Sequence, residues 1–254
     1  MTRRASDKAM GAALPVLGVL SIVFLWWIAL PLFGVPAFVV PTPLAVAAKL
    51  IGEWPFLLSN ALPTILESVL GFLFGNLAAI GLAILFVYSR PVRAAYFPVI
   101  LFFNTIPVLA LAPIIILIFG LGLLPKIIIA AIICFFPTLV NMVRGLNLPS
   151  PNELELMHVL SAGKAEVFWR LRVPRSLPLL FTSLKIAATT CVIGAVVGEW
   201  IGSNQGLGAL IIQSTFNYQS DRLFAAVFLA SSMALIFFGI VALVERWFIR
   251  ARLA

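Results

Sequence analysis

The chain has 254 residues, of which 63% are hydrophobic and only 10% are charged, and its net charge is +8. Its mean hydropathy is +1.15. A soluble domain carries about 25% charged and 45–50% apolar residues, so this composition excludes a single soluble domain and indicates a protein embedded in lipid. The basic residues lie between apolar stretches, which argues against nucleic acid as the partner of the positive charge.

The first apolar stretch, residues 12–33, follows the basic residues Arg3, Arg4 and Lys8. The apolar region of a cleaved signal peptide spans only about 7–15 residues. A transmembrane helix needs about 20 residues. We therefore expect a retained transmembrane helix at 12–33.

A short helix is expected within the next segment, residues 34–61, which we place on the periplasmic side. Thr42 is a good N-cap, and Pro43 is favoured at a first helical position. The helix should run to about Glu53. It is too short and too polar to cross the bilayer, so we place it at the membrane surface.

Five more stretches are long and apolar enough to span the membrane. They are 66–88, 95–119, 127–146, 178–200 and 223–246. The sequence therefore predicts an all-α polytopic membrane protein, a single transmembrane domain over 1–254 with about six transmembrane helices.

The orientation follows from the lysines and arginines, which concentrate in cytoplasmic loops. With a cytoplasmic N-terminus, only Lys49, Lys126 and Arg222 of the 17 basic residues fall outside. The opposite orientation would reverse this asymmetry. Both termini and the loop 147–176 are therefore predicted to be cytoplasmic.

The loop 147–176 is the one long charged segment between spans. No Gly-x-x-x-x-Gly-Lys-Ser/Thr fingerprint for nucleotide phosphates occurs anywhere in the chain. The loop is expected to form two short helices, the first capped by Asn152, with Glu153 and Glu155 near its positive end.

An apolar stripe of Leu154, Met157 and Leu160 on the first helix fits a groove on a partner protein. An amphipathic loop that lies on the bilayer remains the alternative. The second helix follows Gly163 with its own apolar stripe. Its residues Val167, Phe168 and Leu171 form the stripe, and Arg170, Arg172 and Arg175 are expected to face water or lipid phosphates.

The segment Glu155-Leu-Met-His-Val-Leu-Ser161, followed by Val173-Pro174, resembles the EAA loop of type I ABC importer permeases. Counting back from Pro174 places Glu155 at the Glu of that motif and Ser161 at its Gly. The chain departs from the motif at its two alanines and at this Gly. The resemblance assigns ATPase docking to Glu155, Leu156, Met157, His158, Leu160, Ser161, Gly163 and Pro174.

Further stretches resemble the nitrate/sulfonate/taurine-type branch of these permeases, so the resemblance extends over about 36–250. They are Val40-Pro-Thr-Pro-Leu44, Thr105-Ile-Pro-Val-Leu-Ala-Leu-Ala-Pro113, Phe119-Gly-Leu-Gly122, Phe136-Pro137-Thr138, Gly198-Glu-Trp-Ile-Gly202 and Gly206-Leu-Gly208.

The resemblance implies a MetI-like fold in a multi-pass protein of the bacterial cytoplasmic (inner) membrane. Two permease copies, usually identical, would form the pathway and couple to two ABC ATPase subunits. A periplasmic or lipid-anchored binding protein would deliver a small solute. That solute would be a nitrate-, sulfonate- or taurine-like anion, or a pyrimidine- or vitamin-like compound. The chain itself would not be an enzyme and would bind no cofactor, since ATP and Mg²⁺ would lie on the ATPase.

Several polar residues are candidates to line a pathway. Asn104 and Thr105 precede the helix-breaking Pro107, and Asn141 lies near an inner helix end. Glu199 near an outer end either gates or contacts substrate, or it pairs with a neighbour or reaches water.

Small residues and cysteines have structural interpretations. Gly71/Gly75 and Gly194/Gly198 form Gly-x-x-x-Gly patterns that favour close helix packing. Cys134 and Cys191 each lie inside an apolar run and are interpreted as core residues. No metal site and no catalytic residues are expected.

Two other classes remain as alternatives. A secondary transporter or channel often carries ionisable residues at the membrane midplane and inverted repeats, and neither is evident here. A membrane enzyme needs a cluster of His, Asp, Glu or Cys near one interface, which the sequence lacks.

Overall fold

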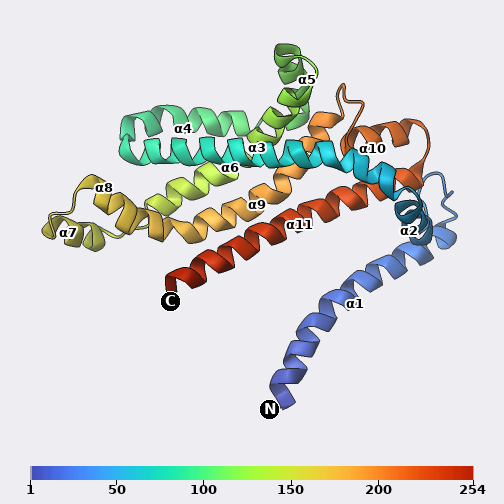
Figure 1. Cartoon of the computed structure of the whole chain (residues 1–254), viewed down its shortest axis with the longest axis horizontal. Helices are drawn as coiled ribbons and strands as arrows, with labels where there is room; N and C mark the ends of the chain where they lie inside the picture. The colour runs from blue at the N-terminus through green and yellow to red at the C-terminus, as the bar shows by residue number, and fades with distance from the viewer. Residues whose placement is uncertain (1, 254) are drawn as a thin grey trace. The chain divides into compact units, whose positions relative to one another are not determined.

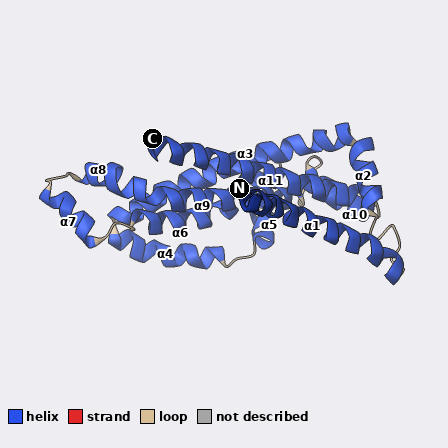
Figure 2. Cartoon of the chain, turned by 90° about the horizontal axis from the view of Figure 1, so that it is seen from below, coloured by secondary structure: helices blue, strands red, loops and turns tan. Residues whose placement is uncertain are grey.

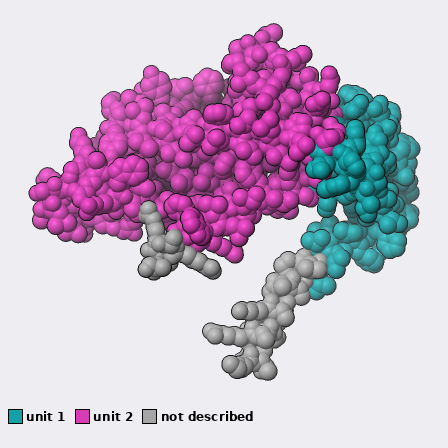
Figure 3. Space-filling model, in the orientation of Figure 1, with its two compact units in different colours: residues 1–58, 210–228 teal, residues 59–209, 229–254 magenta. Residues whose placement is uncertain are grey.

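The computed structural model is helical throughout (Figure 1; Figure 2). It describes the backbone of residues 2–253 and the side chains of residues 14 and 17–248. Two compact units can be distinguished, one of residues 1–58 and 210–228 and the other of residues 59–209 and 229–254 (Figure 3).

Within the described residues every regular element is a helix. The elements are α1 (Thr2–Phe33), α2 (Pro43–Gly52), α3 (Trp54–Tyr88), α4 (Arg90–Asn104), α5 (Val108–Phe119), α6 (Leu123–Leu146), α7 (Pro151–Val159), α8 (Lys164–Val167), the π-helical turn η1 (Phe168–Arg172), α9 (Val173–Glu199), α10 (Leu207–Phe216) and α11 (Ser220–Leu253).

Four helical stretches among the described residues are long and apolar enough to cross a membrane. They are Trp54–Tyr88, Leu123–Leu146, Lys164–Glu199 and Ser220–Phe248, and the bent pair α4 and α5 counts as a fifth. The expected first span falls on α1, whose described apolar part is Leu17–Phe33. The all-α polytopic fold is confirmed, with a helix count compatible with about six spans.

The stretch 95–119, expected as one span, is not a single continuous helix, because the chain bends by 103° between α4 and α5. Pro107 has no N–H to continue the helix, and it disfavours helical geometry in the residue before it. The chain instead makes a tight turn in which the Thr105 N–H bonds to Phe102 O at 3.0 Å. The bend therefore sits beside two of the polar pathway candidates, Asn104 and Thr105.

The short helix expected after the first span is confirmed as α2. The Thr42 hydroxyl accepts the Ala45 N–H at 3.2 Å, and Pro43 occupies the first helical position. The next helix, α3, begins at once at Trp54. It therefore begins well before the expected span 66–88.

The core of the second unit is built where α3, α6 and α9 pack on one another. A Cβ on Gly75 would lie 2.5 Å from Ala131 O, and one on Gly194 would lie 2.7 Å from Ala130 Cα. These contacts confirm the close packing expected of the Gly-x-x-x-Gly patterns. Cys134 and Cys191 are buried free thiols in the same core, as expected.

Candidate functional site

The loop between α6 and α9 lies at one end of the second unit, where α7 and α8 are found in both views (Figure 1; Figure 2). The second half of the loop, residues 164–176, is called the return arm, and it packs against the core of the unit. Phe168 is only 8% exposed and belongs to the core cluster that contains Phe86 and Leu146. The Arg172 guanidinium donates to Leu146 O, at the end of α6, at 2.7 Å. A cation at this position also complements the negative end of the helix.

Helix α7 is capped by Ser150, so the expected Asn152 cap is wrong. Ser150 and Glu153 form a capping box: the Glu153 N–H donates to Ser150 Oγ at 3.3 Å, and the Ser150 N–H donates to Glu153 Oε2 at 2.8 Å. This reciprocal pair satisfies two helix-end donors, and Pro151 occupies the first helical position, where its missing N–H removes no hydrogen bond. Asn152 lies inside the first turn instead.

Glu153 also bonds to the return arm. Its Oε1 accepts a hydrogen bond from Arg175, in the first turn of α9. The Ser150 backbone N–H, and after it the Arg175 guanidinium, lower the pKa of Glu153. The carboxylate is therefore held in its ionised form and joins α7 to α9.

The sequence suggested that all three arginines of the return arm face water or lipid, but one of them does not. Arg172 is half-buried and contacts Leu146 O. Arg170 and Arg175 are exposed, although Arg170 lies 3.1 Å from Glu166 and Arg175 pairs with Glu153. The sequence pattern missed the contacts of Arg172 and Arg175 because both partners lie on the other arm of the loop.

The exposed apolar face of α7 is formed by Leu156, Val159 and Leu160, which are 59%, 74% and 66% exposed. No residue of α7 is buried. Of the expected stripe, Leu154 and Met157 are half-buried and only Leu160 is exposed. The face is therefore rotated from the expected stripe. The other residues assigned to docking divide into Glu155, His158, Ser161 and Gly163, which are exposed, and Pro174, which is half-buried.

Ser161 closes α7 in a left-handed conformation, with φ of 55°. The Ser161 N–H bonds to His158 O at 2.9 Å, and the Ala162 N–H bonds to Met157 O at 2.9 Å. These two bonds make a Schellman motif, whose left-handed residue is usually glycine. Ser161 therefore keeps the turn geometry in the position where the EAA motif has glycine.

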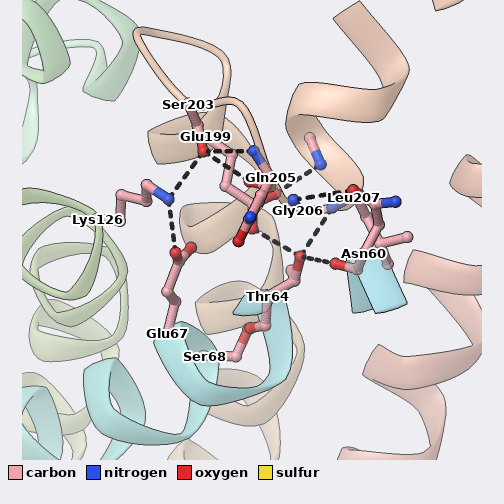
Figure 4. Close-up of polar contacts among 11 residues, drawn as sticks. Asn60, Thr64, Glu67, Ser68, Lys126, Glu199, Ser203, Gln205, Gly206 and Leu207 are labelled. Carbon is pink, nitrogen blue, oxygen red and sulfur yellow. Dashed lines mark hydrogen bonds and ion pairs between the residues drawn. The ribbon is translucent and has the colours of Figure 1, made fainter. Parts of the chain in front are cut away.

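A second group of polar residues is buried at the other end of α9 (Figure 4). Glu199 is fully buried, and both of its oxygens accept hydrogen bonds. Thr64 Oγ1 donates to Oε1 at 2.6 Å, and the Gly208 N–H donates to Oε2 at 2.6 Å. Thr64 Oγ1 in turn accepts the Leu207 N–H at 2.9 Å. The carboxylate thus joins α3, α9 and the start of α10.

A buried ion pair lies beside this group. Lys126 Nζ, on α6, is 2.8 Å from Glu67 Oε1 and 2.9 Å from Ser203 Oγ. Glu67 is 1% exposed, and its Oε2 has no hydrogen-bond partner. We call Thr64, Glu67, Lys126, Glu199 and Ser203 the buried polar cluster. Sequence reasoning missed Glu67 and Thr64, although Glu67 is the one charged residue of α3.

A comparison with protein families decides what kind of protein carries these features. Residues 71–250 match the family described as "Binding-protein-dependent transport system inner membrane component". The chain belongs to this family. It is a type I ABC importer permease, as the EAA-like loop suggested.

Individual relatives agree with this assignment. The permease is 33% identical over 92% of its length to a "Probable ABC transporter permease protein" of Haemophilus influenzae, covering 96% of that protein. It is 32% identical to the formylaminopyrimidine transport permease protein ThiX of Halalkalibacterium halodurans, with 91% and 92% of the two chains covered. It is also 32% identical to the riboflavin transport system permease protein RibX of Chloroflexus aurantiacus, with 93% and 89% covered.

The buried polar cluster accounts for two of the glycines that carry the family resemblance. A Cβ on Gly206 would lie 2.0 Å from Glu199 Oε1, and one on Gly208 would lie 2.2 Å from Val196 O. Gly206 also has φ of 114°, which L side chains rarely adopt. The permease therefore needs both glycines so that the Gly206-Leu-Gly208 segment can lie against Glu199.

The pathway candidates do not gather in one site. Asn104 lines an apolar groove of about 650 Å³ between α3, α4, α5 and α6, and Thr105 and Pro107 are exposed at the nearby bend. Asn141 is half-buried and donates to Pro137 O of its own helix at 2.8 Å. Glu199 belongs to the buried polar cluster and pairs with its neighbours.

Proposed function

We propose that two copies of this permease form the solute pathway of an ABC importer, and that the loop 147–176 of each copy docks on one of two cytoplasmic ATPase subunits. The observation that carries this proposal is the exposed face of Leu156, Val159 and Leu160 on α7. Such apolar anchors at helical spacing fit a groove on a partner protein.

A protein partner explains this face better than the bilayer surface does. Helices that lie on membranes carry lysines and arginines that contact anionic lipids. The charged side chains of α7 are Glu153 and Glu155, and it has neither lysine nor arginine. The acidic character of α7 therefore supports the docking interpretation.

The proposed location is the bacterial cytoplasmic membrane, with both termini and the loop 147–176 in the cytoplasm. The asymmetry of the lysines and arginines supports this orientation. Five of the basic residues that contribute to it have side chains outside the described residues: Arg3, Arg4, Lys8, Arg250 and Arg252.

The proposed cargo is a small pyrimidine- or vitamin-like solute, delivered by an external binding protein that is periplasmic or lipid-anchored. Two relatives at 32% identity are named for formylaminopyrimidine and riboflavin transport, which supports this class over a simple anion. ATP and Mg²⁺ belong to the ATPase in this proposal, and the permease itself binds no cofactor.

The test is co-purification of the ATPase with variants of the exposed face. Leu160→Asp should abolish ATPase capture, because a charge in the centre of an apolar contact is left without a partner. Leu121→Asp is the matched control, since Leu121 is 73% exposed in the loop before α6, on the proposed external side.

Normal ATPase capture by the Leu160→Asp variant would contradict the docking proposal. So would external labelling of a cysteine introduced at Val159. Solute uptake that continues without any ATPase would favour a secondary transporter instead.

A further inference from the structure

The connector between α6 and α7, residues 147–150, is held at both ends by arginines from the return arm. Arg172 donates to Leu146 O, just before the connector, at 2.7 Å. Arg175 donates to Glu153, just after it. Both contacts join segments more than 20 residues apart in the sequence, so they set where α7 lies relative to α6 and α9.

The two contacts differ in how much else supports them. Around Arg172 the chain is fixed by packing, since Phe168 is buried in the core and a Cβ on Gly145 would lie 2.9 Å from Ser176 Cβ. Helix α7 has no buried residue. Its position therefore depends on its connectors, on the half-buried Leu154 and Met157, and on the bond between Glu153 and Arg175.

Glu153 uses its two oxygens for different tasks. Oε2 accepts from the Ser150 N–H at 2.8 Å and from Ser150 Oγ at 3.1 Å, which starts α7. Oε1 accepts from Arg175. A displacement of the first turn of α7 is thus passed directly to the first turn of α9.

Helix α9 can carry such a displacement to the other side of the molecule. It runs from Val173 to Glu199 without a break, which is roughly 40 Å at 1.5 Å per residue. Its far end carries Glu199, which bonds to Thr64 of α3 and to Gly208. The Glu153–Arg175 bond and the buried polar cluster therefore lie at the two ends of one continuous helix.

We propose that Arg175 is a positioning residue for coupling: it fixes α7 to α9, so that movement of a docked ATPase reaches the buried polar cluster. This inference rests on the proposed function, because it assumes that α7 is the docking element. The apolar face of α7 does not include Arg175, so docking and transmission are separable by mutation.

The first experiment uses the purified permease alone and measures hydrogen exchange of the α7 amide groups. Arg175→Gln removes the charge that binds Glu153 and should raise the exchange rates in α7. Arg175→Lys should keep them near wild type, since it retains the charge. Arg170→Gln is the matched control, because it breaks only the exposed Arg170–Glu166 pair.

The second experiment uses the assembled permease–ATPase complex with Mg²⁺, ATP and vanadate as the probe. In the wild type, nucleotide should change hydrogen exchange at the Glu199 end of α9. The Arg175→Gln variant should capture the ATPase in normal amounts, yet its nucleotide-dependent change should fall at least about five-fold. Arg175→Lys should restore most of it, and Arg170→Gln should leave it unchanged.

The two proposals fail in different ways. A wild-type response in the Arg175→Gln complex, or an equal loss in the Arg170→Gln complex, would overturn the positioning role of Arg175. Absence of ATPase capture by the wild type would overturn the proposed function instead. Unchanged exchange in α7 of the isolated Arg175→Gln permease would overturn the positioning role without any ATPase present.

Discussion

The Glu199 carboxylate accepts the backbone N–H of Gly208 at 2.6 Å, and a Cβ on Gly208 would lie 2.9 Å from the same carboxylate. The hydrogen bond and the missing side chain are therefore linked, because the backbone can approach the carboxylate only without a Cβ. A Cβ on the nearby Gly206 would lie closer still, 2.0 Å from Glu199 Oε1, and Gly206 has φ of 114°.

Replacing Gly206 by alanine should destabilise the permease by about 2 kcal/mol or more, because the new methyl group meets Glu199 and the backbone is strained. Gly81→Ala is the control, since Gly81 lies inside α3 and no atom lies within 4 Å of its Cβ position. Alanine there should be neutral or stabilising by up to about 1 kcal/mol. Thermal unfolding in detergent measures both variants, and equal effects would contradict the proposed role of the Glu199 contact.

A second ion pair joins α9 to α11 within the apolar stretches. Lys185 Nζ lies 2.7 Å from Glu245 Oε2, and both side chains are mostly buried. Glu245→Gln should destabilise the fold by about 3 kcal/mol, because it leaves the Lys185 charge without its partner.

The double variant Lys185→Met/Glu245→Met should be more stable than Glu245→Gln, since no buried charge remains. A double-mutant cycle based on unfolding midpoints gives the interaction energy. If the double variant loses as much stability as the sum of the two single methionine variants, the pair contributes little and the prediction is wrong.

The helical spans were readable from the sequence because each has its own local signal. A long apolar run such as 127–146 predicts a helix by itself, and the Thr42-Pro43 pair marks a helix start without reference to the rest of the chain. The Gly71/Gly75 pattern likewise predicted a close helix contact that the structure contains.

The buried polar cluster had no such signal. Glu67 and Lys126 are 59 positions apart, and Thr64 and Glu199 are 135 apart, so only the folded chain brings them together. The 103° bend was predictable only in part. Pro107 predicts a break in the helix, but the angle depends on the packing around it.

The first cap of the docking loop shows how a local signal can be missed. Ser150 and Asn152 are both good N-cap residues. Each also has a glutamate three positions later, Glu153 or Glu155, so this spacing does not distinguish them. Ser150 is followed by Pro151, which is favoured at the first helical position, and the helix starts there.

Acid should weaken the contacts of Glu53, which lies between α2 and α3. The hydrogen bond from Arg222, with a further one from Lys49, lowers the pKa of Glu53 from 4.5 to about 2. Because the folded-state pKa is below the unfolded value, the stabilising contribution is complete above about pH 4.5. It is lost progressively as the pH falls toward 2.

The measurement compares unfolding of the wild type and Glu53→Gln as a function of pH. The stability difference between them should be largest at neutral pH and should shrink below about pH 4.5. Asp221→Asn is a useful control, since Asp221 pairs with Lys49, whereas the Arg222 guanidinium pairs with Glu53. A difference that does not vary between pH 5 and 2 would contradict the assignment.

A substitution in the turn after α7 is expected to stabilise the permease, unlike most of the substitutions above. Ser161 adopts φ of 55° in the Schellman motif, where a side chain costs about 1 kcal/mol relative to glycine. Ser161→Gly should therefore stabilise the turn by up to about 1 kcal/mol, because the strain relieved at positive φ exceeds the entropy that glycine adds to the unfolded chain. Ser161→Val should destabilise it more than Ser161→Ala, because a β-branched residue is least tolerated at positive φ.

Hydrogen exchange of the Ala162 amide is the direct readout, since this N–H bonds to Met157 O and closes the turn. Its protection should follow the order Gly, Ser, Ala and Val at position 161. The exposed face of Leu156, Val159 and Leu160 is unchanged in all four proteins, so differences in ATPase capture would then report the orientation of α7 rather than the loss of a contact. If protection is highest with valine at this position, Ser161 is not in the left-handed conformation and the turn has another geometry.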